Sequence, residues 1–436
     1  MDTASQLERW LNSNKFAYNL GEACSRLALA NSSETLVRAC LLRHHHESEQ
    51  NYVLVLIPTH HVLELSQLAL HFGGHFDGLN PDQLPRALQR APAMPGWQAL
   101  NCYIDTSLFN YKTLYLDSGN PNDSIKLSLE DFKQAVANMP HASFSHPLRQ
   151  STKNLRQSHD FNSRRLRQRL DETLELPIMR HSSEEILRQR NAPRDSNALC
   201  RIVENDPSLA LQVVSWASSP YYAAPTKVKS VRDAIDRVLG YDKVLNLCLC
   251  LASHNQVKGL DQLQLELYAH NASLTAHCCT ALAAQIRQGP RLELGLARMT
   301  GLLRNFGQLL IAELFPLYHR QIRRVERANV HIGQSGAQTE IIGVSGDALA
   351  CYLFESWSLP EEIITALTEQ HKPDYRGEHQ RYAQLLRCAS ALLAEQGLVN
   401  GPLIAVDDEL HQLGIRKEDA DSVLEHCRIL GEQNRY

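Results

Sequence analysis

The sequence predicts a chain of two parts, an α/β region at residues 1–147 and an all-helical region after it. The α/β part is indicated by Asn51–Pro58, whose β-branched and other apolar residues are typical of a buried strand. The helical part is indicated by Leu199–Ala252, where apolar helical stretches are separated by proline and glycine. With 436 residues, 43% of them hydrophobic, the chain is long enough for two or three packed domains.

The α/β region alternates apolar runs with polar breaks. The polar run HHHESEQ separates two predicted strands, so we expect His44–His46 to lie in a solvated hairpin loop. Gly73 and Gly74 are predicted to end a helix, because glycine readily adopts the left-handed conformation at a helix C-terminus. The predicted strands are Ala17–Leu20, Thr35–Arg43, Asn51–Pro58, Ala99–Asp105 and Thr113–Leu116, and the predicted helices are Gln6–Asn12, Val62–Phe72 and Leu129–Asn138.

A basic segment, residues 148–170, is predicted to be a linker whose second half can join the next helix. Seven lysines and arginines but only one acid lie between Arg149 and Arg169, which creates a local positive field. Arginine binds phosphate in a bidentate manner, so a phosphate-containing ligand such as cyclic diguanylate is one interpretation. The other is a solvated linker that folds against an acidic patch. The candidate ligand-binding residues are Arg164, Arg165, Arg167 and Arg169.

The helical region carries clear start and stop signals. Asp206-Pro207 predicts a helix start, because proline at the first helical position loses no hydrogen bond. Ser218–Pro220 ends that helix. Ser230 is a predicted N-cap, and Gly240 is predicted to end the same helix. Further helices are predicted at Lys243–Ala252 and, within a C-terminal helical extension at residues 376–436, at Tyr382–Glu395, Asp407–Leu413 and Asp419–Gly431.

The composition excludes several classes of protein. A formal net charge of −4 argues against a protein that coats nucleic acid with its whole surface. The 11 cysteines lack the spacing of metal knuckles, and Cys248, Cys250, Cys278 and Cys279 lie in apolar helical surroundings, which predicts buried, reduced thiols. No apolar run approaches the roughly 18 residues of a membrane-spanning helix, and no signal peptide is indicated. We therefore expect a cytoplasmic protein without membrane insertion.

The stretch Leu199–Ala252 resembles the first half of the HDOD domain, a bacterial signalling module related to the HD phosphohydrolases. The resemblance implies an all-α HDOD (HD-like) fold over residues 171–375. Ala217-Ser218 departs from the Asn-Ser usual in that family. The matching positions are Asp206-Pro207, Ser219, Tyr222, Ala234-Ile235 and Leu239-Gly240.

The same resemblance implies that no metal centre is retained. HD phosphohydrolases hold divalent metals with histidine and aspartate, and the metal generates the attacking hydroxide. Here the His-Asp pair reads Arg304-Asn305, a further histidine reads Gly346, and the first residue of a His-His pair reads Gln370. Arginine is a permanent cation and asparagine a weak neutral ligand, so metal-dependent phosphodiesterase activity is not expected. His277 and His371 are expected to be packed or hydrogen-bonded.

Residues 1–147 resemble the YbaK-like aminoacyl-tRNA deacylase domain, which edits prolyl-tRNA. In active members a lysine on the first central strand helps to hold the ester, and here that position is Arg38. The planar guanidinium cannot replace a compact ammonium in a tight pocket. The Gly-x-x-x-Pro loop keeps Gly96 but has Leu100 in place of proline. A degenerate domain without catalytic residues is therefore expected. The resembling pieces include Phe16–Leu20, Ile57-Pro58, Tyr103–Leu108 and Ile125–Ser128.

The order of the two domains resembles that of regulators of surface attachment in pseudomonads. This implies control of biofilm formation and swarming motility, linked to cyclic diguanylate. We expect a non-catalytic signalling protein, either an effector that binds cyclic diguanylate or an adaptor with a protein partner, without a cofactor and without tRNA as a partner. The alternative is a trans-editing hydrolase of mischarged aminoacyl-tRNA, with Arg38 and Asp105 in its site. The oligomeric state and the direction of regulation stay open.

Overall fold

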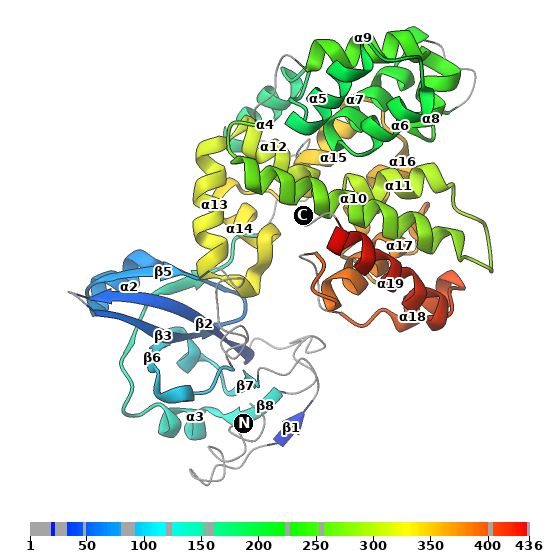
Figure 1. Cartoon of the computed structure of the whole chain (residues 1–436). Helices are drawn as coiled ribbons and strands as arrows, with labels where there is room; N and C mark the ends of the chain where they lie inside the picture. Colours follow the sequence, from blue (N-terminus) through cyan, green and yellow to red (C-terminus); the bar gives the residue numbers. More distant parts are fainter. Residues whose placement is uncertain are drawn as a thin grey trace. The chain divides into compact units, whose positions relative to one another are not determined.

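The chain divides into two compact units (Figure 1). The first comprises Met1–Ser151 together with Arg320–Gly343, and the second comprises Thr152–His319 and Val344–Tyr436. The predicted fold class, an α/β part followed by a helical part, is confirmed. The structure is a computed structural model that describes residues 19–21, 33–46, 49–79, 92–118, 124–150, 155, 161–222, 227–252, 257–399 and 404–433.

The first unit is built on a mixed sheet with the strand order β1-β8-β7-β2-β3-β6-β9. β2 and β3 form an antiparallel pair at its centre, whereas β2 and β7, and β3 and β6, pair in parallel. β5 pairs with the far end of the long strand β2. The strands are β1 (Asn19–Gly21), β2 (Glu34–His46), β3 (Glu49–Pro58), β5 (His75–Gly78), β6 (Asn101–Asp105), β7 (Thr113–Asp117), β8 (Ser124–Ser128) and β9 (His141–Ala142); β4 (His61–Leu63) pairs with β10 (Ser145–Pro147) in a small second sheet.

Both faces of the large sheet are buried. Side chains alternate between the two faces along a strand, so Val37 and Leu42 of β2 belong to different apolar layers. The layer of Val37 also contains Trp97 and Phe132, the latter from α3 (Leu129–Ala135). The layer of Leu42 includes apolar side chains of β3, β5 and α2 (Leu65–Phe72). Burial on both faces explains why β3 is continuously apolar from Val53 to Ile57 instead of alternating with polar residues.

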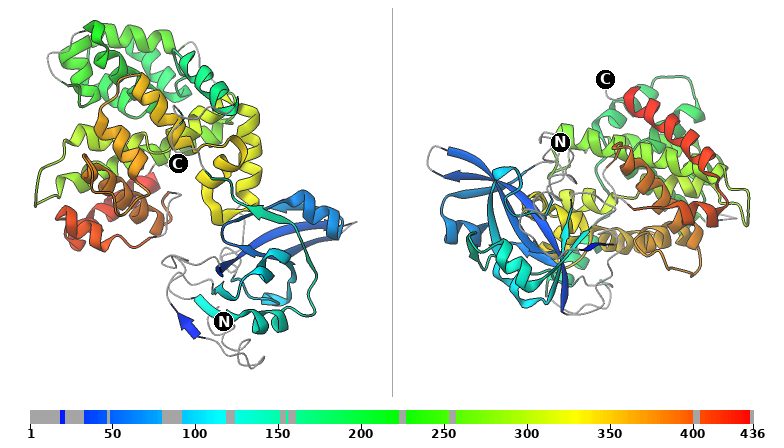
Figure 2. Two further views of the ribbon diagram at one scale, coloured as in Figure 1. Left: turned by 180° about the vertical axis from the view of Figure 1, so that it is seen from behind. Right: turned by 90° about the horizontal axis from the view of Figure 1, so that it is seen from below.

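A segment from far along the sequence, Arg320–Gly343, completes the second apolar layer. We call it the helical insert; it contains the end of α13 (Pro316–Ala328), a 3-10 turn, η7 (Val330–Ile332), and α14 (Gly333–Ile342). Ala328 packs in the layer of Leu42. A Cβ on Gly78 of β5 would lie 2.3 Å from the carbonyl carbon of Arg327, so the two backbones are in direct contact. Both Figure 1 and Figure 2 show the yellow insert against the blue strands.

Asn329 anchors the helical insert through its side chain. Its Oδ1 accepts a hydrogen bond from the Leu63 amide at 2.7 Å, and its Nδ2 donates to the Leu63 carbonyl at 3.2 Å. Asn329 is fully buried. The Asn329 carboxamide thus satisfies both backbone groups of Leu63, as the backbone of a neighbouring strand would do.

The second unit is entirely helical in the part of the chain that the structure describes. Asp206 caps α7 by accepting hydrogen bonds from the amides of Ser208 and Leu209, at 2.9 and 3.1 Å. It also accepts one from Met179, and its complete burial raises its pKa. α10, α17 and α19 pack together. The helices are α4 (Phe161–Asp171), α5 (Arg180–Gln189), α6 (Ser196–Glu204), α7 (Pro207–Ser218), α9 (Tyr241–Leu251), α10 (Gln262–Ala284), α11 (Leu294–Leu302), α12 (Phe306–Leu314), α15 (Gly346–Ser356), α16 (Glu361–Glu369), α17 (Gln380–Glu395), α18 (Asp407–Leu413) and α19 (Lys417–Gln433).

Several predicted details are confirmed and others need correction. Ser230 caps its helix through the amide of Asp233, and Gly240 ends that helix with a φ of 84°. The prediction that His44–His46 lie in a solvated loop is wrong, because they extend β2 and are paired there with β3 and β5. The predicted helix Val62–Phe72 begins only at Leu65, since its first residues form β4. The predicted helix Gln6–Asn12 lies outside the described residues.

The described cysteines are free thiols, and all are buried except Cys250, which is exposed contrary to the expectation. None of the described helices combines the length and the apolar character that crossing a membrane would need.

Candidate functional site

The turn between α11 and α12 holds the two residues at the position of the metal-binding His-Asp pair. Arg304 is buried, with 8% of its surface exposed, and Asn305 immediately precedes the first residue of α12. Burial lowers the pKa of Arg304, and the negative charge of Asp347 opposes this shift. A guanidinium remains protonated in proteins, so a permanent positive charge lies at this position.

Asp347, in the first turn of α15, joins this arginine to two residues that follow α16. Gln370 donates a hydrogen bond from Nε2 to Asp347 Oδ2 at 3.3 Å. His371 Nε2 lies 3.2 Å from the same oxygen. We call Arg304, Asp347, Gln370 and His371 the Asp347 cluster. The prediction that His371 is a hydrogen-bonded histidine is confirmed.

The position where the resemblance expects another histidine is Gly346, the first residue of α15. A Cβ on Gly307 of α12 would lie 2.1 Å from the carbonyl carbon of Gly346. The backbones of α12 and α15 therefore touch at the edge of the Asp347 cluster. This close approach depends on the missing side chain of Gly307.

A second buried arginine fixes the far side of the cluster. Arg387 of α17 donates a hydrogen bond to the Gln370 carbonyl at 3.3 Å. Its Nε lies 3.3 Å from the carboxylate of Glu409 in α18. The Arg387 side chain is only 3% exposed, so the pair is shielded from solvent. Ionic and hydrogen-bonding contacts thus connect α15, α17 and α18 around Gln370.

The chemistry of the Asp347 cluster favours a structural network over a metal centre. Asp347 and His371 are potential ligands, but Arg304 already balances the carboxylate charge, and Gln370 donates to it. In the described part of the chain, Glu361, Glu378 and His379 do bring three possible ligand atoms within 4.8 Å of one another. Both glutamates are exposed, and exposed acidic groups occur commonly without a metal ion.

The first unit contains the second predicted site, at Arg38 on β2. Arg38 forms an ion pair with Asp117 at the end of β7. Its Nε also lies 3.4 Å from the hydroxyl of Thr59. The two charged side chains are 27% and 19% exposed, so solvent weakens their attraction only in part. The charge of Arg38 is therefore already satisfied by this chain.

The helical insert lies on the same face of β2 as Arg38, because residues 38, 40 and 42 point in one direction. His331 Nδ1 is 3.7 Å from the sulfur of Cys40, and His331 Nε2 donates to the carbonyl of His61 at 2.8 Å. Burial and, to a smaller extent, the nearby charge of Arg38 lower the pKa of His331 to about 4, although the hydrogen bond to the His61 carbonyl opposes this shift. The insert thus covers part of the face that carries Arg38.

Gly96 and Asp105 have structural roles in this unit. Gly96 has a left-handed φ of 74° and begins the short turn that buries Trp97. Asp105 is fully buried, and its two oxygens accept hydrogen bonds from the amides of Ser107 and Phe144, each at 2.9 Å. The second of these bonds links β6 to the chain before β10. Both oxygens of the carboxylate are therefore occupied by backbone donors.

The candidate arginines of the basic segment lie on α4. Leu166 and Leu170 are buried, whereas Arg164, Arg165 and Arg169 are exposed and Arg167 is half-buried. At helical spacing, Arg165 and Arg169 share one side of α4, and Arg164 and Arg167 share another. The second half of the predicted linker has joined a helix, as expected.

Nothing in the sequence predicted the interactions of three residues, Asp347, Asn329 and His331. Asp347 follows a Ser-Gly helix start, and nothing in the local sequence indicates that its charge acts on Arg304. Asn329 and His331 lie between two helices, and nothing local indicates that they contact β4, which is more than 250 positions away in the chain. Only the tertiary pairing makes these residues recognisable.

Comparison with known families agrees with this architecture. The model of the HDOD domain matches residues 176–373, and the model of the aminoacyl-tRNA editing domain matches residues 18–135. The chain joins an aminoacyl-tRNA editing domain to an HDOD domain. The helical insert, Arg320–Gly343, lies within the HDOD match but packs with the editing domain.

Solved structures add a relative with the same extent. A proposed signal transduction protein from Marinobacter aquaeolei VT8 is 26% identical, with a TM-score of 0.61, over 100% of this chain and 98% of that chain. The response regulator MmoQ from Methylococcus capsulatus str. Bath is 22% identical, with a TM-score of 0.49, over 57% of this chain and 98% of its own. A proposed trans-editing enzyme for prolyl-tRNA synthetase is 16% identical, with a TM-score of 0.28, over 34% of this chain and 98% of its own. No curated protein matches the chain.

Proposed function

We propose that this chain is a non-catalytic bacterial signalling protein that acts in the cytoplasm. In this proposal it controls biofilm formation and motility, either as an effector of cyclic diguanylate or as an adaptor for a protein partner. The similarity along its whole length to a proposed signal transduction protein supports the signalling role. The Asp347 cluster is the observation that carries the non-catalytic part.

The charge of the Asp347 cluster disfavours a bound metal ion. A divalent cation needs anionic or neutral ligands around it, and a buried guanidinium at the same place repels it. Arg304 is buried, Asp347 lies near it, and Gln370 and His371 donate to the aspartate. The HDOD domain would then act through its surface and not through hydrolysis.

The editing domain supports the same proposal. Asp117 already pairs with the positive charge of Arg38, which a substrate ester or a tRNA end would need. His331 of the helical insert lies on the same face of β2. The domain would serve as a scaffold for docking. Its former substrate face would be partly filled by the chain itself.

The non-catalytic proposal is tested by assaying the purified full-length chain with Mn²⁺ or Mg²⁺. The substrates are bis-p-nitrophenyl phosphate and a panel of cyclic dinucleotides. We expect no turnover above that of the Arg304→Ala variant. Metal-dependent hydrolysis that this substitution abolishes would overturn the proposal.

The second candidate function is trans-editing of mischarged tRNA, favoured by the match to the aminoacyl-tRNA editing domain. The test measures release of the amino acid from a panel of mischarged tRNAs, with the wild-type chain and the Arg38→Lys variant. We expect neither to hydrolyse them, because Asp117 holds the cation and the helical insert covers part of that face. Hydrolysis by the wild-type chain would establish the enzyme and remove the scaffold role.

The effector form of the proposal is tested by calorimetric titration with cyclic diguanylate at fixed salt, with GTP as the control. If α4 holds the phosphates, replacing Arg164, Arg165, Arg167 and Arg169 by Gln should weaken binding at least tenfold. Binding that is unchanged in this variant would exclude α4. No binding to the wild-type chain would leave the protein adaptor as the proposed role.

A further inference from the structure

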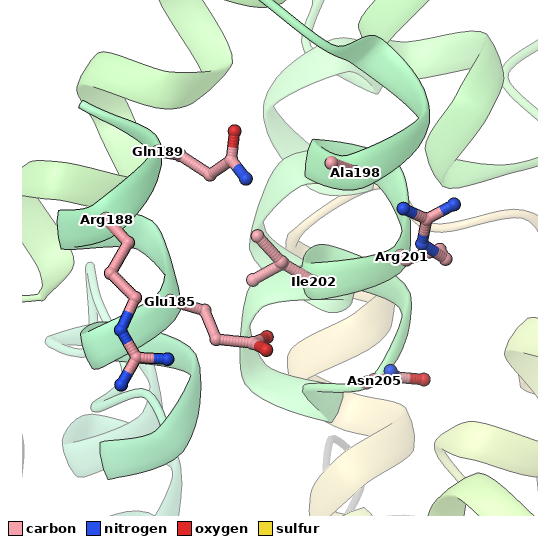
Figure 3. A pocket seen from close by; sticks show the side chains of 7 residues that line it. All are labelled: Glu185, Arg188, Gln189, Ala198, Arg201, Ile202 and Asn205. Carbon is pink, nitrogen blue, oxygen red and sulfur yellow. The ribbon is translucent and has the colours of Figure 1, made fainter. Parts of the chain in front are cut away.

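We propose that the cavity between α5 and α6 binds a guanine nucleotide. The cavity has a volume of about 290 Å³ and lies between two helices of the HDOD domain (Figure 3). The residues that carry the argument are Glu185, Arg188 and Gln189 from α5, Arg201 and Ile202 from α6, and Asn205, which follows α6. The Asp347 cluster and the arginines of α4 do not line this cavity.

The charges around the cavity favour an anionic ligand. Arg188 of α5 and Arg201 of α6 both line the cavity. In Figure 3, Arg188 runs along α5 and Arg201 lies on the side of α6 away from α5. Arg188 is 4.0 Å from its nearest carboxylate, that of Glu184, and its side chain is 73% exposed. Arg201 is exposed and forms no ion pair with any described residue. Either of these weakly engaged guanidinium groups at the rim of the cavity suits a phosphate, which arginine binds through paired hydrogen bonds.

The centre of the cavity offers hydrogen-bond acceptors. Glu185 and Gln189 point from α5 toward Ile202 of α6 (Figure 3). The Glu185 carboxylate accepts only, and its nearest partner is the exposed His181 at 3.4 Å. The Oε1 atom of Gln189 is buried and accepts no hydrogen bond within the described residues, so rotation of the amide toward the cavity breaks no bond to this oxygen. A ligand that enters here therefore needs adjacent N–H donors.

Guanine meets this requirement better than the other bases. Its N1–H and 2-amino group are adjacent donors that one carboxylate accepts together, whereas adenine presents no such pair. Ile202 is buried at 7% exposure and provides an apolar surface for the ring. The volume is at the lower end for ligand pockets, which suits a single mononucleotide unit with its phosphate at the arginine-lined opening.

The proposal is independent of the regulatory function proposed above, because the cavity is lined by other residues than the arginines of α4. Its ligand is any nucleotide that can place one guanine in the cavity. The test is calorimetric titration of the full-length chain with GMP, IMP, AMP and inorganic phosphate at matched salt. IMP lacks the 2-amino group and isolates its contribution. Cyclic diguanylate is titrated in parallel.

Three variants localise the binding. Glu185→Gln should weaken the binding of GMP at least tenfold and reduce the preference for GMP over IMP, because the amide replaces a charged acceptor. Arg201→Gln should weaken GMP and IMP by a similar factor. Arg190→Gln, an exposed arginine next to α5 that does not line the cavity, is the matched control and should bind as the wild-type chain does. Unchanged melting curves show that the variants fold.

The outcomes separate the two proposals. GMP binding that discriminates against IMP and AMP and is weakened by Glu185→Gln supports the pocket. Absence of GMP binding, equal binding of AMP, or affinity unchanged in both Glu185→Gln and Arg201→Gln would overturn it. If cyclic diguanylate binds and these variants do not affect it, the effector proposal stands at another site, and the GMP titrations alone decide the pocket proposal. If GMP binds in the pocket and cyclic diguanylate does not bind, the pocket proposal stands and the effector proposal fails.

Discussion

At the residue scale, one arginine lies in each of the two candidate sites. Arg304 and Arg38 each bring a permanent cation to a position where the family resemblances expect a histidine or a lysine. Each is close to a carboxylate, Asp347 or Asp117. A buried charge is tolerated only when a partner offsets the cost of its desolvation. These carboxylates therefore stabilise the fold, whether or not they also belong to a functional site.

The Asp347→Asn variant should lower the free energy of unfolding of the helical unit by about 1–3 kcal/mol. The substitution leaves the buried guanidinium of Arg304 without its nearby negative charge, and solvent at Asp347 moderates the loss. Urea denaturation followed by circular dichroism measures the change. Asp374→Asn is the control, because Asp374 is exposed, and its unfolding free energy should change by less than about 0.5 kcal/mol. Equal stability of the two variants would show that Asp347 has no role in the network.

The histidines of the first unit should make its stability depend on pH. The pKa values of His61 and His331 are lowered to about 4, chiefly by burial; for His61, the charges of His60 and His146 contribute to this shift and Asp105 opposes it. The unfolded chain binds protons near pH 6.5, so between pH 6.5 and 4 it holds more protons than the folded unit. Stability should therefore be complete above pH 6.5 and fall as the pH drops toward 4.

This loss should reach at least about 2 kcal/mol at pH 4. Denaturant unfolding of the wild-type chain and of His331→Gln at several pH values measures it. The variant should show a smaller slope, because one of the two groups no longer titrates. A slope that is the same in both chains would contradict the assignment to His331.

At the scale of elements, close backbone contacts at glycines determine how neighbouring elements pack. Gly78 lets β5 touch the end of α13, and Gly307 lets α12 touch α15. The carboxamide of Asn329 then completes the hydrogen bonding of β4. Small residues at these contacts are needed because any Cβ would meet backbone atoms, which cannot move aside as a flexible side chain can.

Gly78→Ala should destabilise the first unit by about 1–3 kcal/mol, because its Cβ would overlap the backbone of Arg327 and Ala328. Thermal unfolding of the full-length chain measures the effect. Gly431→Ala, within α19, is the control: its Cβ would meet ordinary contacts only, and alanine favours the helix by up to about 1 kcal/mol. If both variants were stabilised, the contact between β5 and α13 would be looser than described.

At the scale of the whole molecule, the sequence order and the packing order differ. The helical insert belongs to the HDOD match by sequence and to the editing domain by packing. The editing domain therefore depends on residues that follow it by about 170 positions. The apolar layer of Leu42 is thus built from two distant parts of the chain.

A fragment of residues 1–151 should consequently fold poorly by itself. Without the helical insert, the apolar layer of Leu42 loses Ala328, and the backbone of Leu63 loses both hydrogen bonds to Asn329. We expect the fragment to bind the dye ANS and to melt at a lower temperature than the first unit of the full chain. A fusion that joins residues 320–343 to the fragment through a flexible linker should restore much of the stability. A fragment as stable as the full chain would contradict this dependence.

The sequence by itself determined the features that local chemistry controls. The apolar run of β3, the Asp206-Pro207 start of α7 and the Ser230 and Gly240 ends of the next helix were predicted because capping groups and strand burial leave marks within a few residues. The resemblances added both domains and the positions Arg38, Arg304, Gly346 and Gln370.

Only the tertiary structure decided what these residues contact. The pairing of β5 with β2 turned His44 and His45 from a predicted loop into strand residues. The electrostatic interaction of Arg304 with Asp347 and the hydrogen bonds of Asn329 with Leu63 join positions 43 and 266 residues apart. Such contacts depend on how helices and strands pack in space, and neither spacing nor composition along the chain records that packing.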